Sequence, residues 1–226
     1  MKNLLKNSKA YYENNDFYEI FSQAEDGENK VVEYLKNICV DKIVLDAGCG
    51  TGKFLNILEE NSKKYIGIDI SDKQLEKAKE KSKKNNSSFI CSNLSEFNLK
   101  DNTVDLVISS WVLGTVIDLN ERTRCLNELK RVLKPNGIII LIENDLGGEF
   151  EEIRNRTKDN RTLDYNNWIL GNGFKVEKRI KTFFDFKNID IARKCFDIIY
   201  GNDIASKIKN RIVKHNIIIF KYLKTE

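Results

Sequence analysis

The chain has 226 residues, of which 41% are hydrophobic and 32% are charged. Single α/β domains typically span ~100–250 residues, so we expect one domain over residues 1–226. Its 38 Lys and Arg residues against 34 Asp and Glu residues give a net charge of +4, whereas dedicated nucleic-acid binders carry a stronger and more clustered basic excess.

Helix and strand patterns alternate over the first two thirds of the chain. Val31, Leu35 and Ile38 recur at helical spacing, and Pro135 ends a later helix before an Asn136-Gly137 turn. In chain order the expected elements are a helix over 28–37, a strand over 42–46, a helix over 51–60, a strand over 65–69, a helix over 72–83, strands over 88–91 and 104–110, a helix over 119–133 and a strand over 138–142.

The strand expected over 138–142 is apolar at every position rather than at alternate positions. Strands that helices cover on both faces have this composition, and parallel sheets are nearly always covered in this way. The alternation of strands and helices therefore predicts a doubly wound α/β sheet.

The pattern changes after Glu143. We expect a polar helical stretch through residue 161, a helix over 163–170, an edge strand over 173–180, helical segments over 190–213 and a closing strand over 215–223. Residues 1–27 form a polar, aromatic-rich leader. It could be a lid over a ligand or a helix packed on the sheet.

The five cysteines show neither a CxxC pair nor the spacing of a zinc site, so we expect reduced thiols in a cytoplasmic protein and no metal. The first residues contain no apolar segment of a secretory signal, and no window approaches the ~18 apolar residues of a membrane span. The cysteines are Cys39, Cys49, Cys91, Cys125 and Cys195.

The most informative segment is Val44-Leu-Asp-Ala-Gly-Cys-Gly-Thr-Gly-Lys53. Glycines between a strand and a helix let the backbone approach a ligand closely. Their spacing is G-x-G-x-G rather than the G-x-G-x-x-G of a pyrophosphate-binding loop. Asp46 stands two residues before the first glycine, where its carboxylate could attract a ligand's ammonium group.

A second carboxylate, Asp69, ends the next expected strand, 21 residues after Gly48 (69 − 48). A carboxylate at this place accepts hydrogen bonds from the two ribose hydroxyls of a nucleoside. Capping of the following helix is the alternative role for Asp69.

Segment 45–52 closely resembles the first motif of class I S-adenosylmethionine (SAM)-dependent methyltransferases. The resemblance continues through Asp69, 102–109 and 128–139, covers about residues 28–145, and returns weakly at 170–176. It implies an α/β, doubly wound, mostly parallel seven-stranded sheet with helices on both faces. The strand over 215–223 would supply the antiparallel last strand. The core over 28–145 would bind the cofactor, and 146–226 would add substrate-side helices and the last two strands.

The resemblance also assigns roles to residues. Asp46 and the glycine loop would line the methionyl end of SAM, Asp69 would hold the ribose, and Asn93 stands where the family usually has an acidic residue. Ile70 would pack on the adenine, Leu94 would offer backbone contacts to it, and the residues after the fourth strand would border the methyl group. The full cofactor set is Asp46, Gly48, Cys49, Gly50, Gly52, Asp69, Ile70, Asn93, Leu94, Ser109 and Ser110.

The implied reaction is methyl transfer to an N or O atom of a small-molecule acceptor, with S-adenosylhomocysteine as the product. The segment 109–112 lacks the Asn/Asp-Pro-Pro-aromatic motif of nucleic-acid amino methyltransferases and the Pro-Cys of cytosine-C5 enzymes. An RNA-modifying methyltransferase and a non-catalytic SAM-binding protein remain as alternatives. No membrane partner is expected, and the oligomeric state is not predicted.

Acceptor-side candidates lie in segments that overhang the strand ends: Tyr11, Tyr18, Trp111 and Glu143. Trp111 could be a wall or core residue or a substrate platform. No general base stands out, and the lone histidine, His215, suits a surface or structural role. A second set would suit an anionic acceptor or simply the polar face of a helix. It comprises Arg154, Arg156 and Arg161.

Overall fold

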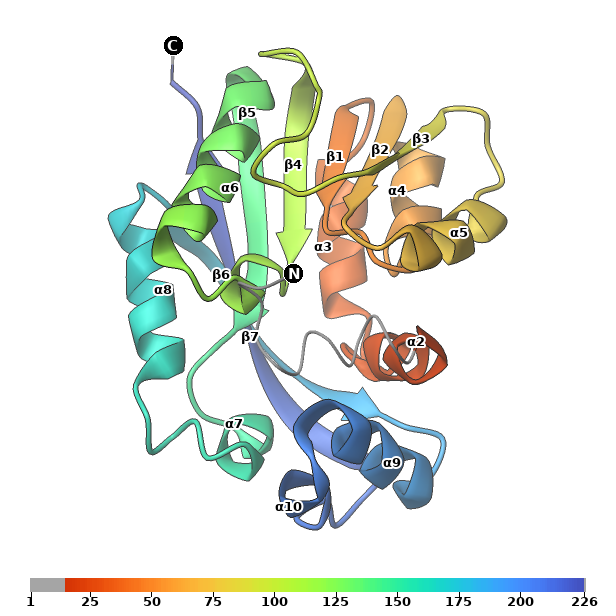
Figure 1. The fold of residues 1–226 in the computed structure, drawn as a ribbon, viewed down its shortest axis with the longest axis vertical. Helices are drawn as coiled ribbons and strands as arrows, with labels where there is room; N and C mark the ends of the chain where they lie inside the picture. Colours follow the sequence, from red (N-terminus) through yellow and green to blue (C-terminus); the bar gives the residue numbers. More distant parts are fainter. Residues whose placement is uncertain (1–14, 226) are drawn as a thin grey trace.

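The computed structural model describes residues 15–225, which form one seven-stranded sheet with helices around it (Figure 1). The strand order is β3-β2-β1-β4-β5-β7-β6. β7 runs antiparallel to both β5 and β6, and the pairs among β1 to β5 are parallel. This confirms the predicted fold class. The strands are β1 (Ile43–Ala47), β2 (Lys64–Asp69), β3 (Ser87–Cys91), β4 (Val104–Ser110), β5 (Leu133–Asn144), β6 (Lys175–Asp185) and β7 (Ile212–Leu223).

Several helices begin at side chains that cap the free backbone N–H groups of a first turn. Asp118 accepts a hydrogen bond from the N–H of Glu121 at 2.8 Å, and Asn188 accepts one from the N–H of Ile191 at 2.9 Å. The helices are α2 (Asn15–Ala24), α3 (Lys30–Ile38), α4 (Leu55–Asn61), α5 (Asp72–Lys81), the 3-10 helix η1 (Leu113–Thr115), α6 (Leu119–Val132), α7 (Glu149–Ile153), α8 (Arg161–Gly171), α9 (Ile189–Tyr200) and α10 (Asn202–Ala205).

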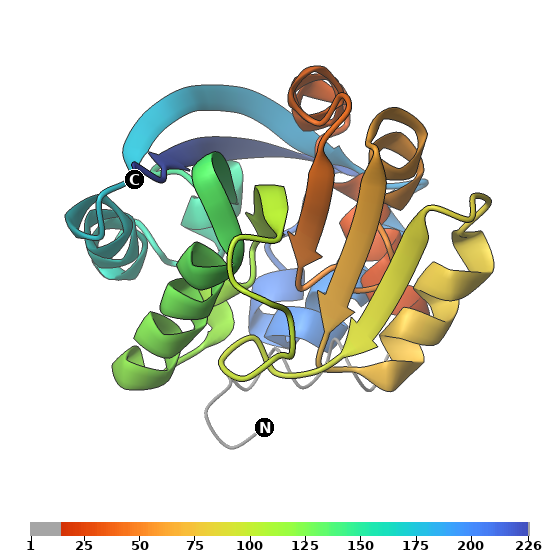
Figure 2. The same cartoon turned by 90° about the horizontal axis from the view of Figure 1, so that it is seen from above.

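Helices cover both faces of the sheet, so its central strands are buried on both sides. On one face, Leu35 of α3 and Leu58 of α4 pack against β1, β4 and β5. On the other, Leu129 of α6 and Ile169 of α8 pack against the same sheet. Figure 2 shows α3 and α4 on one side of the strands and α6 on the other. This double burial explains the continuous apolar run of β5.

A third hydrophobic cluster lies beyond the carboxyl ends of the parallel strands, where β6 and β7 extend past their neighbours (Figure 1). Phe21 of α2 packs there against Phe184 of β6 and Phe196 of α9, with ring centroids 5.0 and 5.6 Å apart. The described part of the leader is therefore a helix that packs on the C-terminal elements. None of the helices in residues 15–225 has both the length and the apolar character needed to cross a membrane.

Two predicted helical stretches end earlier than expected. The polar stretch through residue 161 is helical only in α7, which ends at Ile153, and Asn155 takes a left-handed φ of 58° that interrupts the helix. The helical segments over 190–213 end at Ala205, and β7 begins at Ile212. At the start of β7, Val213, His215 and Ile217 alternate inward, and the residues before the expected strand start at 215 pair with the end of β6.

Two strands also differ from the prediction. β6 covers 175–185 rather than 173–180, because its second half pairs with the early residues of β7. The turn expected over 134–137 lies within β5, where Leu133 already pairs with Val104 before an irregularity in the register. Asn136 there has a φ of 60°, so a local turn is present, but it interrupts the strand without ending it.

Candidate active site

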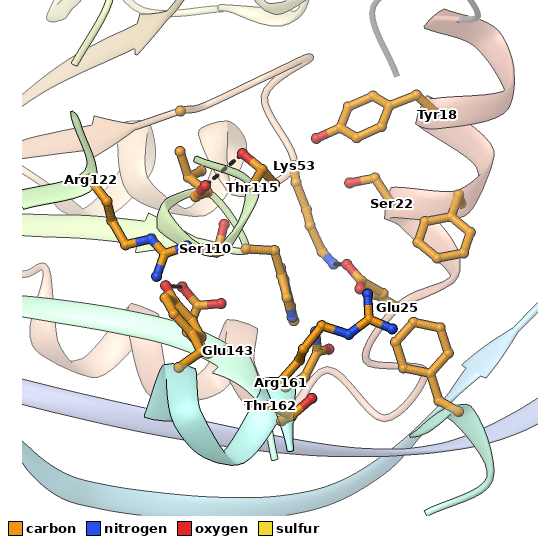
Figure 3. Close-up of a pocket in the computed structure, with 18 of the residues that line it drawn as sticks. Tyr18, Ser22, Glu25, Lys53, Ser110, Thr115, Arg122, Glu143, Arg161 and Thr162 are labelled. Atoms are coloured by element: carbon orange, nitrogen blue, oxygen red, sulfur yellow. Dashed lines mark hydrogen bonds and ion pairs between the residues drawn. The ribbon is translucent and has the colours of Figure 1, made fainter. Parts of the chain in front are cut away.

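A cavity of about 600 Å³ lies at the carboxyl ends of the parallel strands. Asp46 of β1, Asp69 of β2, Ser110 of β4 and Glu143 of β5 line it from the sheet. Side chains from α2, from the segment around η1, and from the α7–α8 region complete its walls. Figure 3 shows Tyr18 and Ser22 of α2 facing the residues from the strand ends. Ligands of open α/β sheets bind at this edge of the sheet.

The glycine loop forms the floor of the cavity beside β2. The N–H groups of Gly48 and Cys49 both donate to the carbonyl of Ile68, at 2.7 and 2.9 Å. Gly48 has a φ of 79°, and a Cβ at this position would lie 2.3 Å from Cγ2 of Val112. Only glycine fits there, because a side chain would meet both a strained backbone and an occupied space.

Asp69 holds the glycine loop from the end of β2. Its Oδ2 accepts a hydrogen bond from the N–H of Gly50 and its Oδ1 accepts one from the N–H of Ser71, both at 2.9 Å. Burial raises the pKa of this carboxyl above its ordinary value. Each oxygen of a carboxylate can accept a second hydrogen bond, so Asp69 retains the capacity to bind hydroxyl groups of a ligand.

Asp46 lies deeper in the same part of the cavity. The hydroxyl of Tyr65 donates to its Oδ2 at 3.1 Å. The pKa of Asp46 is raised to about 7, mainly by burial and in part by the nearby charge of Asp69, against the hydrogen bond from Tyr65. A cationic group bound beside Asp46 would favour its ionised form and lower this pKa.

Trp111 forms a wall of the cavity directly after β4. Its φ is 55°, which is uncommon for a bulky residue and is typical of positions held in place by function or packing. Its indole Nε1–H is buried without a hydrogen-bond partner among the described residues, and the ammonium of Lys53 lies 4.6 Å from the ring centroid. Trp111 therefore lines the cavity and also packs against one of the core clusters.

Glu143 lies at the β5 side of the cavity. The hydroxyl of Tyr165 donates to its Oε1 at 2.7 Å, and Figure 3 shows the guanidinium of Arg122 beside it. The pKa of Glu143 is raised to about 8, mainly by burial and in small part by Glu25, although Tyr165 and Arg122 act to lower it. A carboxyl group with such a pKa can exchange a proton near neutral pH.

Helix α2 covers the glycine-loop end of the cavity. The hydroxyl of Tyr18 lies 2.8 Å from the position that a Cβ on Gly50 would take. An ion pair of 2.9 Å joins Lys53 to Glu25, just after α2, and Lys81 pairs with Glu19 at 2.6 Å. The described part of the leader therefore lines the cavity on one side and packs against the C-terminal elements on the other.

His215 is buried next to the cavity but does not line it. Its Nε2 lies 2.9 Å from Oδ1 of Asn144, and its ring lies 4.8 Å from those of both Phe150 and Phe184. Burial lowers the pKa of His215 well below its ordinary value, and the charges of Arg154 and Lys53 contribute. Of the surface and structural positions considered for His215, its burial corresponds to the structural one.

We expect His215 to make the fold sensitive to acid. Its pKa is lower in the folded state than in the unfolded chain, so its contribution to stability is present above about pH 6.5 and is lost as the pH falls below that value. Chemical unfolding across this range should show a steeper loss for the natural protein than for His215→Gln. Equal pH dependences would contradict this, and the NMR signal of the chain's single histidine reports its protonation directly.

The geometry agrees with comparisons to known proteins. A methyltransferase-domain family model matches residues 45–141. The chain is 32% identical over 201 residues to the uncharacterized protein MJ1252 of Methanocaldococcus jannaschii, covering 82% of this chain and 74% of that protein. It is 38% identical over 105 residues to the malonyl-[acyl-carrier protein] O-methyltransferase of a Marinomonas species, covering 43% of this chain and 36% of that enzyme.

The chain belongs to the class I SAM-dependent methyltransferases. A solved structure with the same fold is the N-methyltransferase NodS of Bradyrhizobium japonicum in complex with S-adenosylhomocysteine. It has a TM-score of 0.60 at 13% identity and covers 88% of this chain and 87% of its own. At this identity the likeness concerns the fold alone.

The methyltransferase's expected cofactor residues divide into two groups. Those that line the cavity are Asp46, Gly48, Cys49, Asp69 and Ser110. Those that do not line it are Gly50, Gly52, Ile70, Asn93, Leu94 and Ser109. In the second group, the side chain of Asn93 donates to Glu121 at 3.1 Å, and Ile70 is 36% exposed beside Asp69.

Among the expected acceptor residues of this methyltransferase, Tyr18, Trp111 and Glu143 line the cavity, and Tyr11 lies outside the described residues. The structure also brings Arg154, Arg156 and Arg161 to the wall. Several other residues line the cavity but were not predicted, because they belong to no recognisable sequence motif. The missed lining residues include Glu25, Lys53, Arg122, Tyr165 and Trp168. Within residues 15–225, no group of three or more His, Cys, Asp or Glu residues could hold a metal ion.

Proposed function

We propose that this methyltransferase transfers a methyl group from SAM to an N or O atom of a small molecule bound in the same cavity. The observation that carries the proposal is the continuity of the cavity, which joins the glycine loop and Asp69 to Glu143 and Tyr165. Its volume of about 600 Å³ is within the ~300–1,000 Å³ of small-molecule pockets.

The residues around the glycine loop fit SAM. Gly48 leaves no room for a side chain between the loop and Val112, so the loop backbone itself faces the cavity. Asp46 would attract the ammonium of the methionyl end, Asp69 would accept the ribose hydroxyls, and Ile70 would pack on the adenine. SAM, when bound, supplies a methyl group already activated on a sulfonium.

Because the methyl group is already activated, the protein contributes mainly orientation, which can be worth ~7–11 kcal/mol. Trp111 and Tyr165 line the β4–β5 side of the cavity, where their rings would shield a bound acceptor from water. Glu143 lies on this side, where its carboxylate would take the proton of a hydroxyl or an ammonium acceptor. Asp46 and Asp69 lie at the glycine-loop end and serve the cofactor instead.

Two measurements test the proposed function. Calorimetric titration with SAM and S-adenosylhomocysteine should show saturable binding, and NAD should show none. Transfer of labelled methyl from SAM is then measured with small amines, alcohols and acids on one side and RNA on the other. Labelling of RNA alone would replace the small-molecule acceptor, and SAM binding with no labelled product in either arm would indicate a non-catalytic protein.

Asp69→Ala is expected to weaken SAM binding by about tenfold or more, since it removes hydrogen bonds to a charged acceptor, each worth ~1.5–3 kcal/mol. The same calorimetric titration measures the effect. Glu76→Ala is the matched control, because it removes an exposed carboxylate from the neighbouring helix α5. If SAM binds equally well to both variants and the natural protein, Asp69 does not hold the cofactor.

A further inference from the structure

Three guanidinium groups line the cavity wall formed by the α7–α8 region. Arg154 and Arg156 come from the connection after α7, and Arg161 is the first residue of α8. The side chains of Arg154 and Arg156 are only 10% and 18% exposed, whereas that of Arg161 is 65% exposed at the rim. Two of these three positive charges are therefore largely withdrawn from water.

Only two carboxylates form ion pairs with these three guanidiniums among the described residues. Glu151 pairs with Arg154, and Asp159 pairs with Arg161 through two hydrogen bonds. Arg156 has Asp159 as its nearest carboxylate, at 3.8 Å, a distance beyond a hydrogen bond. Three positive charges on this wall thus share two carboxylates, and Arg156 has only the long contact to a carboxylate that Arg161 already binds.

The guanidinium of Arg156 donates no hydrogen bond within the described part of the chain, yet it is mostly buried and faces a cavity. Three like charges on one wall repel one another, and burial together with the charges of Arg154 and Arg161 lowers the pKa of Arg156. A bound anion would relieve this repulsion. The planar fork of a guanidinium matches the two oxygens of a carboxylate or a phosphate.

We propose that the methyl acceptor carries a carboxylate or phosphate group and that Arg156 binds this group, with Arg161 at the rim as a second contact. This inference rests on the proposed function, because it places the acceptor in the cavity shared with SAM. The anionic group would be held at the α7–α8 wall, and the atom that receives the methyl group would lie toward Glu143. Arg156 is thus a specificity-determining residue.

The first test uses protein saturated with S-adenosylhomocysteine and titrates it separately with inorganic phosphate and with acetate, following the fluorescence of Trp111 and Trp168 in the cavity wall. We expect saturable binding of at least one anion, weakened about tenfold or more in Arg156→Ala, since hydrogen bonds to charged groups are worth this much. Stronger binding of phosphate or of acetate identifies the acceptor's anionic group. Saturation by neither anion, or equal affinity in Arg156→Ala, would overturn the proposal.

Lys158→Ala is the matched control, because it removes one positive charge from the same connection at an exposed residue that does not line the cavity. It should bind the anions as the natural protein does, and an equal loss in both variants would show that only the general charge matters. Arg156→Lys keeps the positive charge but lacks the two parallel donors of a guanidinium, so it should bind the anions with intermediate affinity. If Arg156→Ala does not fold, Arg156→Lys is used in its place.

A second test separates this inference from the proposed function. Each acid in the acceptor panel is compared with its neutral ester, and each phosphate monoester with its alcohol. Arg156→Ala should raise KM about tenfold for the anionic member of a pair, with little change in kcat, and should leave the neutral member unaffected. Absence of SAM binding would refute the proposed function. Methyl transfer that favours the neutral members would refute the anionic acceptor alone.

Discussion

Replacing Glu143 with glutamine is expected to lower kcat for methyl transfer by ~10²–10⁴-fold, the usual contribution of a positioned general base. Glutamine keeps the size of the side chain and can still meet the hydroxyl of Tyr165, but it cannot accept a proton. SAM affinity should not change, because Glu143 lies on the β5 side of the cavity. Single-turnover rates, measured with an acceptor found in the screen, would show the loss.

The methyl-transfer rate should also depend on pH in a defined direction. The pKa of Glu143 is raised to about 8, and the ionised form is the base, so the rate should rise with pH and level off above that value. Tyr165→Phe removes a hydrogen bond that favours the carboxylate, so it should move the rise to higher pH. Glu152→Gln, at an exposed residue of α7, should retain the natural profile. A Glu143→Gln enzyme with unchanged kcat would rule out this base.

The second large effect is expected from Gly48→Ala. The added Cβ would lie 2.3 Å from Cγ2 of Val112, at a φ of 79°. A left-handed backbone costs a non-glycine residue roughly 1–2 kcal/mol, and overpacking adds ~1–3 kcal/mol. If the loop moves away to relieve this strain, it withdraws from the ligand, so we expect SAM affinity to fall about thirtyfold or more.

Calorimetric titration measures the affinity of Gly48→Ala, and chemical unfolding measures how much of the strain appears as lost stability. Gly171→Ala is the matched control, because nothing lies within 4 Å of the Cβ it adds at the end of α8. Alanine is favoured over glycine in helices by ~0.5–1 kcal/mol, so the control should be neutral or slightly more stable. If Gly48→Ala bound SAM as tightly as the control does, the loop would not contact SAM closely.

The parallel core of the fold was predictable because local patterns and the long-range arrangement agree there. Strands buried on both faces are apolar throughout, as Ile138 to Ile142 are, and each is followed by a turn signal or a polar helix. The C-terminal part was harder to predict. Ile212 and Val213, the first residues of β7, owe their structure to pairing with β6, which the local sequence does not show, so the expected strand begins only at His215.

The residues of the candidate site also differ in how well the sequence could predict them. Asp46, Asp69 and the glycines belong to contiguous motifs whose spacing along the chain determines their spacing in the fold. Arg122, Tyr165 and Arg156 come from three separate segments, and they meet only because α6, α7 and α8 return to the same end of the sheet. For Arg154, Arg156 and Arg161, the sequence favoured the polar face of a longer helix. The early end of α7 places all three on the cavity wall.

The packing of α2 has a consequence for the order in which the molecule can be completed during synthesis. One side of this helix covers the glycine loop, while Phe21 packs on Phe184 and Phe196, which the ribosome makes more than 150 residues later. Contacts this distant in sequence form late in folding. A nascent chain ending after β5 can therefore align its parallel strands and form the ion pairs of Glu19 and Glu25 with Lys81 and Lys53, whereas the packing of Phe21 must wait for β6 and α9. The aromatic side of α2 would be among the last parts of the structure to form.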